Sequence, residues 1–130
     1  MVIELLVADQ PARSASHDPD SEFWQWAERI GQVESRFPKR VAPPSDASHP
    51  AMLVNLDSCI HCTLCVRACR EVQVNDVIGM SGRGHDAYPT FDMSDPMGDS
   101  SCVACGECVQ ACPTGALMPA TVTDFELTYC

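Results

Sequence analysis

A chain of 130 residues with a formal net charge of −10 is long enough for one small domain and an additional arm. The excess of acidic residues argues against binding to nucleic acid, because nucleic-acid-binding surfaces are rich in lysine and arginine. The apolar start, MVIELLVA, is short, is interrupted by Glu4 and follows no basic segment, so it predicts neither a secretion signal nor a membrane span. We therefore expect a cytoplasmic protein.

Residues 1–37 are predicted to form a helical arm. Apolar residues recur there with the spacing of one helical face: Phe23, Trp26, Ala27 and Ile30. Ser21 is typical of the residue that precedes a helix, and Gly31 is typical of the residue that ends one. Trp24 lies off that face, so we expect it to cover a neighbouring surface or to contact a partner.

Residues 38–50, PKRVAPPSDASHP, are rich in proline and serine, which favours an extended linker. Residues 51–120 follow as the domain that carries the chemistry, and residues 121–130 remain as a C-terminal tail. In that domain, strands are predicted at 52–57, 77–80 and 88–93, and helices at 64–72 and 106–112. Pro89 restricts its strand to an edge or to the strand start.

Eight of the nine cysteines fall into two copies of one pattern, C-x2-C-x2-C-x3-C. The first copy holds Cys59, Cys62, Cys65 and Cys69, and the second holds Cys102, Cys105, Cys108 and Cys112. This is the ligand spacing of proteins that bind two [4Fe–4S] clusters. The copies lie 43 residues apart and agree beyond the cysteines, CIHCTLCVRAC against CVACGECVQAC, which indicates an internal duplication.

In this pattern the fourth cysteine of each copy ligates the cluster of the other copy. We therefore assign the first cluster to Cys59, Cys62, Cys65 and Cys112. The second cluster is assigned to Cys102, Cys105, Cys108 and Cys69. Because neither copy completes its own cluster, metal binding becomes part of the folding free energy. The predicted fold class is α+β, a ferredoxin-like two-[4Fe–4S] domain preceded by a short helical arm.

Two other interpretations of the cysteines remain open. Structural zinc sites also use C-x2-C pairs, but a tetrahedral ion has no use for a third cysteine at the same spacing. Disulfides between neighbours in tight loops are strained, and nothing in the sequence suggests secretion.

For three residues near the motifs, and for Cys130 at the end of the sequence, the pattern does not decide the role. Arg67 and Arg70 follow the first motif and either offset the negative charge of the clusters or form ordinary solvated helix surface. His61 lies between two ligands and is expected to be a bystander or a hydrogen-bond donor, since all four thiolates are already present. Cys130 is either a free thiol or a ligand of a further cluster.

The motifs CVRACREVQ and CVACGECVQACPTGAL, together with DVIGM and DPMGDS, resemble a known family. This region is similar to the iron–sulfur part of the alpha subunit of NAD-dependent, molybdenum-containing formate dehydrogenases. Related modules occur in the large iron–sulfur subunit of NADH dehydrogenase and in the diaphorase subunits of NAD-linked hydrogenases. The likeness extends over about residues 1–120, and members of the family are several times longer, so the resemblance implies a fragment.

The resemblance implies an oxidoreductase part that relays electrons from a molybdopterin formate-oxidising centre to a flavin and NAD partner subunit. No acid, base or nucleophile is arranged for bond breaking, so we expect no catalytic residue and no catalysis by this chain alone. The alternatives are a free-standing ferredoxin-like carrier, or the equivalent module of an NADH dehydrogenase or NAD-linked hydrogenase.

Overall fold

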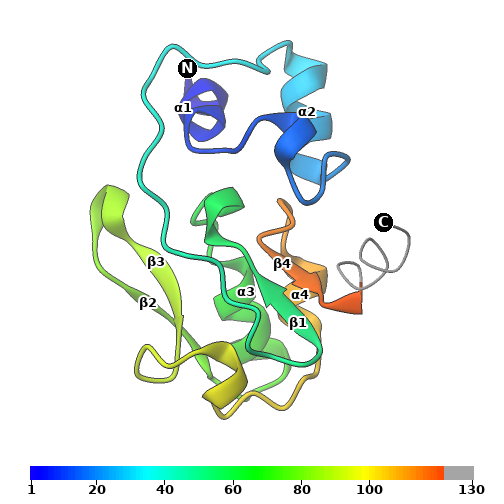
Figure 1. The fold of residues 1–130 in the computed structure, drawn as a ribbon, viewed down its shortest axis with the longest axis vertical. Helices are drawn as coiled ribbons and strands as arrows, with labels where there is room; N and C mark the ends of the chain where they lie inside the picture. The colour runs from blue at the N-terminus through cyan, green and yellow to red at the C-terminus, as the bar shows by residue number, and fades with distance from the viewer. Residues whose placement is uncertain (122–130) are drawn as a thin grey trace.

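The arm and the cysteine-bearing region form two groups of elements, placed one above the other in Figure 1. The structure is a computed structural model that describes residues 1–121. The arm consists of helices α1 (Val2–Ala8) and α2 (Glu22–Ile30). The remaining elements are β1 (Met52–Val54), α3 (Leu64–Arg67), β2 (Ile78–Ser81), β3 (Tyr88–Phe91), α4 (Glu107–Ala111) and β4 (Leu117–Pro119). The predicted α+β architecture is confirmed, whereas the boundaries between arm, linker, domain and tail stay predictions.

Two antiparallel strand pairs frame the cysteine-bearing region. β1 pairs with β4, with Met52 opposite Pro119 and Val54 opposite Leu117, so the two ends of the region lie side by side. β2 and β3 form a separate ribbon, in which both strands are edges and Pro89 is therefore tolerated. The strand predicted over 52–57 is too long, because the chain turns after Val54 into a short 3₁₀ segment that leads to Cys59.

The helices that follow the two cysteine motifs differ at their ends. α3 continues after Arg67 as a π-helical turn, Ala68–Val72, so the helix predicted over 64–72 changes its hydrogen-bonding pattern halfway. α4 ends at Ala111, and Cys112 is extended with φ −77° and ψ 117°. The difference follows from Pro113, because a residue before proline is driven out of the helical region. The two repeats thus differ in their backbone after the fourth cysteine.

Helix α2 has the predicted ends but not the predicted buried face. It follows Ser21 and stops at Gly31, whose φ of +78° is the left-handed conformation that glycine adopts freely. The predicted stripe is wrong at Trp26, which is 49% exposed, and at Ile30, which is 59% exposed. Trp24 is buried instead, at 2% exposure. The buried face is therefore rotated towards Trp24.

The arm packs against the cysteine-bearing region through that rotated face. Phe23, Trp24 and Ala27 form a buried cluster with Val7 of α1, and Ile60 of the first cysteine loop packs on it. The backbone N–H of Phe23 donates to the carbonyl of Pro113 at 3.0 Å. From the end of α1, Gln10 Nε2 donates to the carbonyl of Ser58 at 2.9 Å. The arm therefore contacts both the first cysteine loop and the chain beyond Cys112.

We expect Trp24→Ala to lower the free energy of unfolding of the arm by about 3 kcal/mol, the usual cost of truncating a buried aromatic side chain. Trp24 is almost fully buried and meets Phe23 edge to face, with ring centroids 5.4 Å apart. The matched control is Trp26→Ala, which removes a half-exposed ring and should cost less than about 0.5 kcal/mol. Urea unfolding followed by circular dichroism measures both, and equal losses would contradict the observed packing.

Candidate metal centre

The two cysteine loops are built alike in the backbone as well as in the sequence. His61 and Ala104, at equivalent positions of the two motifs, both have φ +58°. Thr63 and Gly106 are equivalent in the same way, at φ +61° and +80°. Left-handed backbone is costly for residues other than glycine and is held only where the surrounding structure requires it. The duplication inferred from the sequence therefore extends to loop conformation.

Backbone amides in both loops point at cysteine sulfur. The N–H of His61 donates to Cys59 Sγ at 3.4 Å, and the N–H of Ala104 donates to Cys102 Sγ at the same distance. A further N–H, that of Val77, donates to Cys69 Sγ at 3.3 Å. Such contacts stabilise the thiolate form of cysteine, which is the form that binds iron.

Four cysteines gather around one small cavity beneath the first loop. The cavity is lined by Cys59, Cys62, Cys65 and Cys112, with Leu56, Thr114 and Leu117 among its other walls. Burial first, and then the negative charge of three neighbouring thiolates, raises the pKa of Cys65 to about 12. Those neighbours are Cys59, Cys112 and Cys62. The structure thus brings Cys112 to the three leading cysteines of the first motif.

The other four cysteines gather around Cys108. Burial, followed by the charge of neighbouring cysteines, raises the pKa of Cys108 to about 12. These neighbours are Cys102, Cys105 and Cys69. Cys108 Sγ also lies 3.9 Å from Met52 Sδ of strand β1. Cys69, from the first motif, is thus placed with the leading cysteines of the second.

Both groups of cysteines suit an iron–sulfur cluster in donor chemistry, because thiolate sulfur is the usual protein ligand of such clusters. Each group offers four sulfurs, all eight of these cysteines are free, and amide donors face the sulfur atoms. Among residues 1–121, no three cysteine, histidine or acidic side chains converge on a point that could hold a single metal ion. A [4Fe–4S] cluster needs ligand sulfurs that lie farther apart than those of a single metal ion, because each sulfur binds a different iron.

The two inner cysteines of each motif have matching exposure, whereas the outer ones do not: Cys59 and Cys69 are buried, but their equivalents Cys102 and Cys112 are half-buried. Cys62 and its equivalent Cys105 are exposed, whereas Cys65 and its equivalent Cys108 are buried. Each cysteine group therefore has two buried members and one exposed member, and its remaining member is half-buried.

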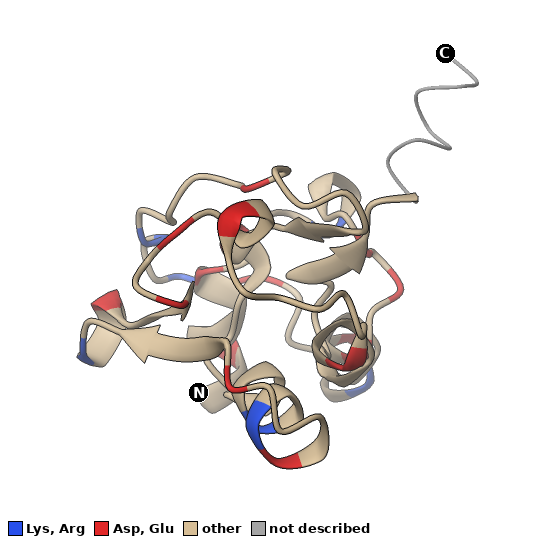
Figure 2. Ribbon diagram, turned by 90° about the horizontal axis from the view of Figure 1, so that it is seen from below, with Lys and Arg blue, Asp and Glu red and all other residues tan. Residues whose placement is uncertain are grey.

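Arg67 and Arg70 lie on the solvent side of the helix after the first motif. Arg67 is 63% exposed and pairs with Glu71, and Arg70 is 58% exposed and pairs with Asp76. These ion pairs match the interpretation of the two arginines as solvated helix surface. Figure 2 shows acidic residues around the outline of the ribbon, with the few basic ones scattered among them.

The buried cation near the first group comes from Arg40, a residue that the sequence analysis did not single out. Its side chain is 6% exposed, and its Nη2 donates to the carbonyls of Leu56 and Cys59 at 3.3 and 3.1 Å. Its Nη1 contacts His61 Nε2, which must accept because a guanidinium only donates. Burial and then the Arg40 charge lower the pKa of His61. The His61 side chain is therefore an acceptor here, whereas its backbone N–H is the donor to Cys59 Sγ.

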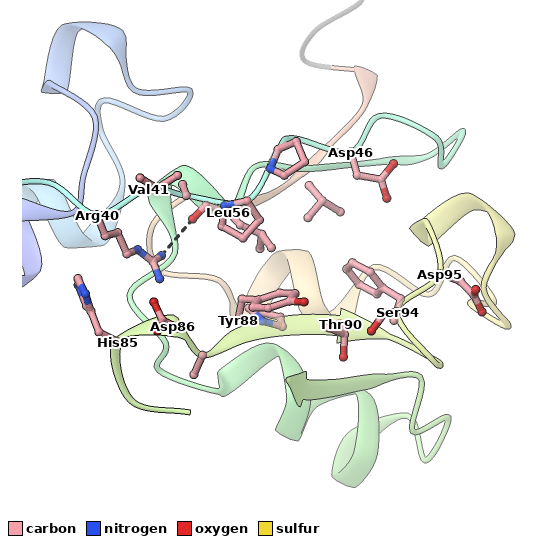
Figure 3. Close-up of a pocket in the computed structure, with 17 residues that line it drawn as sticks. Arg40, Val41, Asp46, Leu56, His85, Asp86, Tyr88, Thr90, Ser94 and Asp95 are labelled. Carbon is pink, nitrogen blue, oxygen red and sulfur yellow. Dashed lines mark hydrogen bonds between the residues drawn. The ribbon is translucent and has the colours of Figure 1, made fainter. Parts of the chain in front are cut away.

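A large groove lies away from the cysteines. It has a volume of about 510 Å³ and separates residues 40–46 from strand β3, as Figure 3 shows. Its walls include Tyr88, Phe91 and two successive prolines, Pro43 and Pro44, and no cysteine. Size alone therefore does not mark the chemical centre of this molecule.

No helix among residues 1–121 is long and apolar enough to cross a membrane. Cys130 lies outside the described residues.

Residues 52–116 match a protein family described as "4Fe-4S dicluster domain". The chain is 36% identical over 123 residues to a subunit of the NADH-quinone oxidoreductase of Rhizobium meliloti, covering 90% of this chain and 14% of that protein. It is 33% identical over 127 residues to NADP-reducing hydrogenase subunit HndD of Solidesulfovibrio fructosivorans, covering 90% of this chain and 20% of that protein.

A protein of Staphylococcus haemolyticus provisionally named a formate dehydrogenase is 30% identical over 99 residues, covering 76% of this chain and 10% of that protein. Among solved structures, a chain of the NAD⁺-reducing [NiFe]-hydrogenase in the H₂-reduced state is similar with a TM-score of 0.76 and 27% identity. That match covers 92% of this chain and 52% of the hydrogenase chain. The chain thus spans a fifth or less of the length of these curated relatives.

Proposed function

Because this chain belongs to the 4Fe-4S dicluster domain family, we propose that it is an electron-transfer module that binds two [4Fe–4S] clusters. The ligands of the first are Cys59, Cys62, Cys65 and Cys112. Those of the second are Cys102, Cys105, Cys108 and Cys69. The observation that carries the proposal is the exchange of the fourth cysteines, since Cys112 lines the cavity of the first motif and Cys69 neighbours Cys108 of the second.

When bound, such a cluster accepts or releases one electron at a time without making or breaking substrate bonds. In each group two cysteines are buried, one is half-buried and one is exposed, and the exposed ones are Cys62 and Cys105. Amide donors at Cys59, Cys102 and Cys69 stabilise the thiolates. The chain therefore supplies ligands, partial enclosure and one exposed cysteine in each group, which is what an electron relay requires.

The proposed electron path runs from a molybdopterin formate-oxidising centre, through this module, to a flavin and NAD partner subunit. Support comes from the similarity to a provisionally named formate dehydrogenase and to a chain of an NAD⁺-reducing hydrogenase. The equivalent module of an NADH dehydrogenase or hydrogenase has support of the same kind. We place the protein in the cytoplasm, where such thiolate sites stay reduced.

A free-standing carrier is the second candidate function, and one structural feature favours it. The buried face of the arm is occupied within the chain, by Ile60 and by the backbone beyond Cys112. The arm therefore has a role that needs no partner. The outward residues of α2, including Trp26 and Ile30, remain exposed.

The purified chain with its clusters intact should take up electrons from dithionite but show no formate-dependent reduction of NAD. It carries cluster ligands and, among the described residues, no pocket formed by the cysteine motifs large enough for a flavin or nicotinamide. Turnover should appear when the segment is joined to a molybdenum domain and a flavin-bearing partner. The assay follows NADH absorbance, and turnover by the chain alone would mean that it holds a catalytic site of its own.

A further inference from the structure

Arg40 differs from the other paired cations of the described chain in its burial. Its side chain is 6% exposed, whereas the ion-paired side chains of Arg13, Arg36, Lys39, Arg67 and Arg70 are between 35% and 69% exposed. A charge removed from water is screened less, so it acts more strongly on neighbouring charges than a surface arginine does. Arg40 is therefore the cation most able to influence a buried centre nearby.

The guanidinium of Arg40 is held against the first cysteine loop. It donates to the carbonyl of Cys59, the first proposed ligand, and to the carbonyl of Leu56 shortly before it. It also contacts His61, which lies between Cys59 and Cys62 in the sequence. Figure 3 shows the side chain reaching from the linker to Leu56 at one end of the groove. These contacts fix a positive charge at the loop that carries Cys59 and Cys62.

The negative partner of Arg40 is Asp9. Asp9 Oδ2 lies 3.9 Å from Arg40 Nε, beyond hydrogen-bonding distance, and Nε has no hydrogen-bond partner. The same carboxylate accepts a hydrogen bond from the backbone of Arg40 and lies 2.8 Å from His85 Nε2. Asp9 is therefore shared with His85 and offsets only part of the Arg40 charge.

Within the part of the chain that the structure describes, the second cysteine loop has no counterpart to this arrangement. Among the hydrogen bonds of residues 1–121, none runs from an arginine or lysine side chain to the backbone of residues 99–112. The two loops share their backbone conformation, so the contact with buried Arg40 is a difference between them. The two proposed clusters thus lie in different electrostatic surroundings.

We propose that Arg40 is a positioning and tuning residue that raises the reduction potential of the cluster held by the first loop above the value it would have without this charge. The inference rests on the proposed two-cluster function. Reduction adds one electron, and hence one negative charge, to the cluster and its thiolates, and a fixed positive charge nearby favours the more negative state. No proton or bond is involved. The order in which the two clusters fill with electrons is then set partly by the linker.

The test is a redox titration of the fully loaded chain with dithionite as reductant, followed by electron paramagnetic resonance. Arg40→Gln should reduce the equilibrium constant for reduction of the first cluster about tenfold, which corresponds to about 59 mV for one electron. The second cluster should not shift. Arg36→Gln is the matched control, because it removes the same charge from a side chain that is 69% exposed and pairs with Glu4. Arg40→Lys keeps the charge and should restore most of the potential.

Asp9→Asn is a second, independent variant, and it should shift the reduction potential of the first cluster in the opposite direction. It removes the partial counter-charge and keeps a side-chain oxygen that can accept from the Arg40 backbone, so the first cluster should become easier to reduce. If Arg40→Gln loses the first cluster, the Asp9→Asn shift decides: an upward shift supports the proposal, and no shift overturns it. Equal shifts in Arg40→Gln and Arg36→Gln also overturn it. Failure of the unmodified chain to hold two clusters would instead count against the proposed function.

Discussion

Cys112→Ser is expected to remove about half of the iron from the loaded chain, and to remove it from the cluster of the first motif. Cys112 stands in the second motif, yet it lines the cavity formed by Cys59, Cys62 and Cys65. Serine offers a harder oxygen donor in place of thiolate, which suits iron–sulfur clusters poorly. The mutation should therefore leave the second cluster and its spectrum intact.

Cys69→Ser should produce the mirror-image result, since Cys69 neighbours Cys108 of the second motif. Two exposed cysteines of the proposed ligand sets serve as references for the spectra, Cys62 for the first group and Cys105 for the second. After reduction, the spectrum of Cys112→Ser should coincide with that of Cys62→Ser, and the spectrum of Cys69→Ser with that of Cys105→Ser. If Cys112→Ser resembles Cys105→Ser instead, each motif binds its own cluster and the ligand assignment is wrong.

Features set by neighbours along the chain were predictable from the sequence. The cysteine spacing identified both loops, and the duplication inferred from their sequences is accompanied by a shared backbone conformation at His61 and Ala104. Ser21 and Gly31 marked the ends of helix α2 because helix boundaries depend on residues within one turn, although the Ser21 side chain makes no capping hydrogen bond. The extended backbone of Cys112 has a local cause of the same kind, because Pro113 restricts the residue before it.

Features set by contacts between distant segments were not predictable in the same way. Periodicity placed Trp26 inside and Trp24 off the buried face, but the surface opposite α2 is formed by α1 and Ile60, which the helix sequence does not encode. Strand β4 was missed because only its pairing with β1, across the whole cysteine-bearing region, makes it a strand.

The cations near the clusters show the same limit. Arg67 and Arg70 follow Cys65 and Cys69 in sequence, which made them candidates for offsetting the cluster charge. In the structure both are exposed and pair with nearby acidic residues. Arg40 lies in a segment whose composition indicated only a linker, and it reaches the first loop through the folding of the chain. A contact between residues 16 and 19 positions apart in a non-helical segment leaves no periodic signal in the sequence.

Cluster stoichiometry tests the central claim, because two complete sets of four thiolates imply two cubanes in one chain of 130 residues. After anaerobic reconstitution with iron and sulfide, the chain should hold about eight iron and about eight sulfide. Full reduction with dithionite should give about two unpaired spins per chain, one from each cluster. Tightly bound zinc at about two per chain without sulfide, or a spin count that saturates near one, would contradict the account.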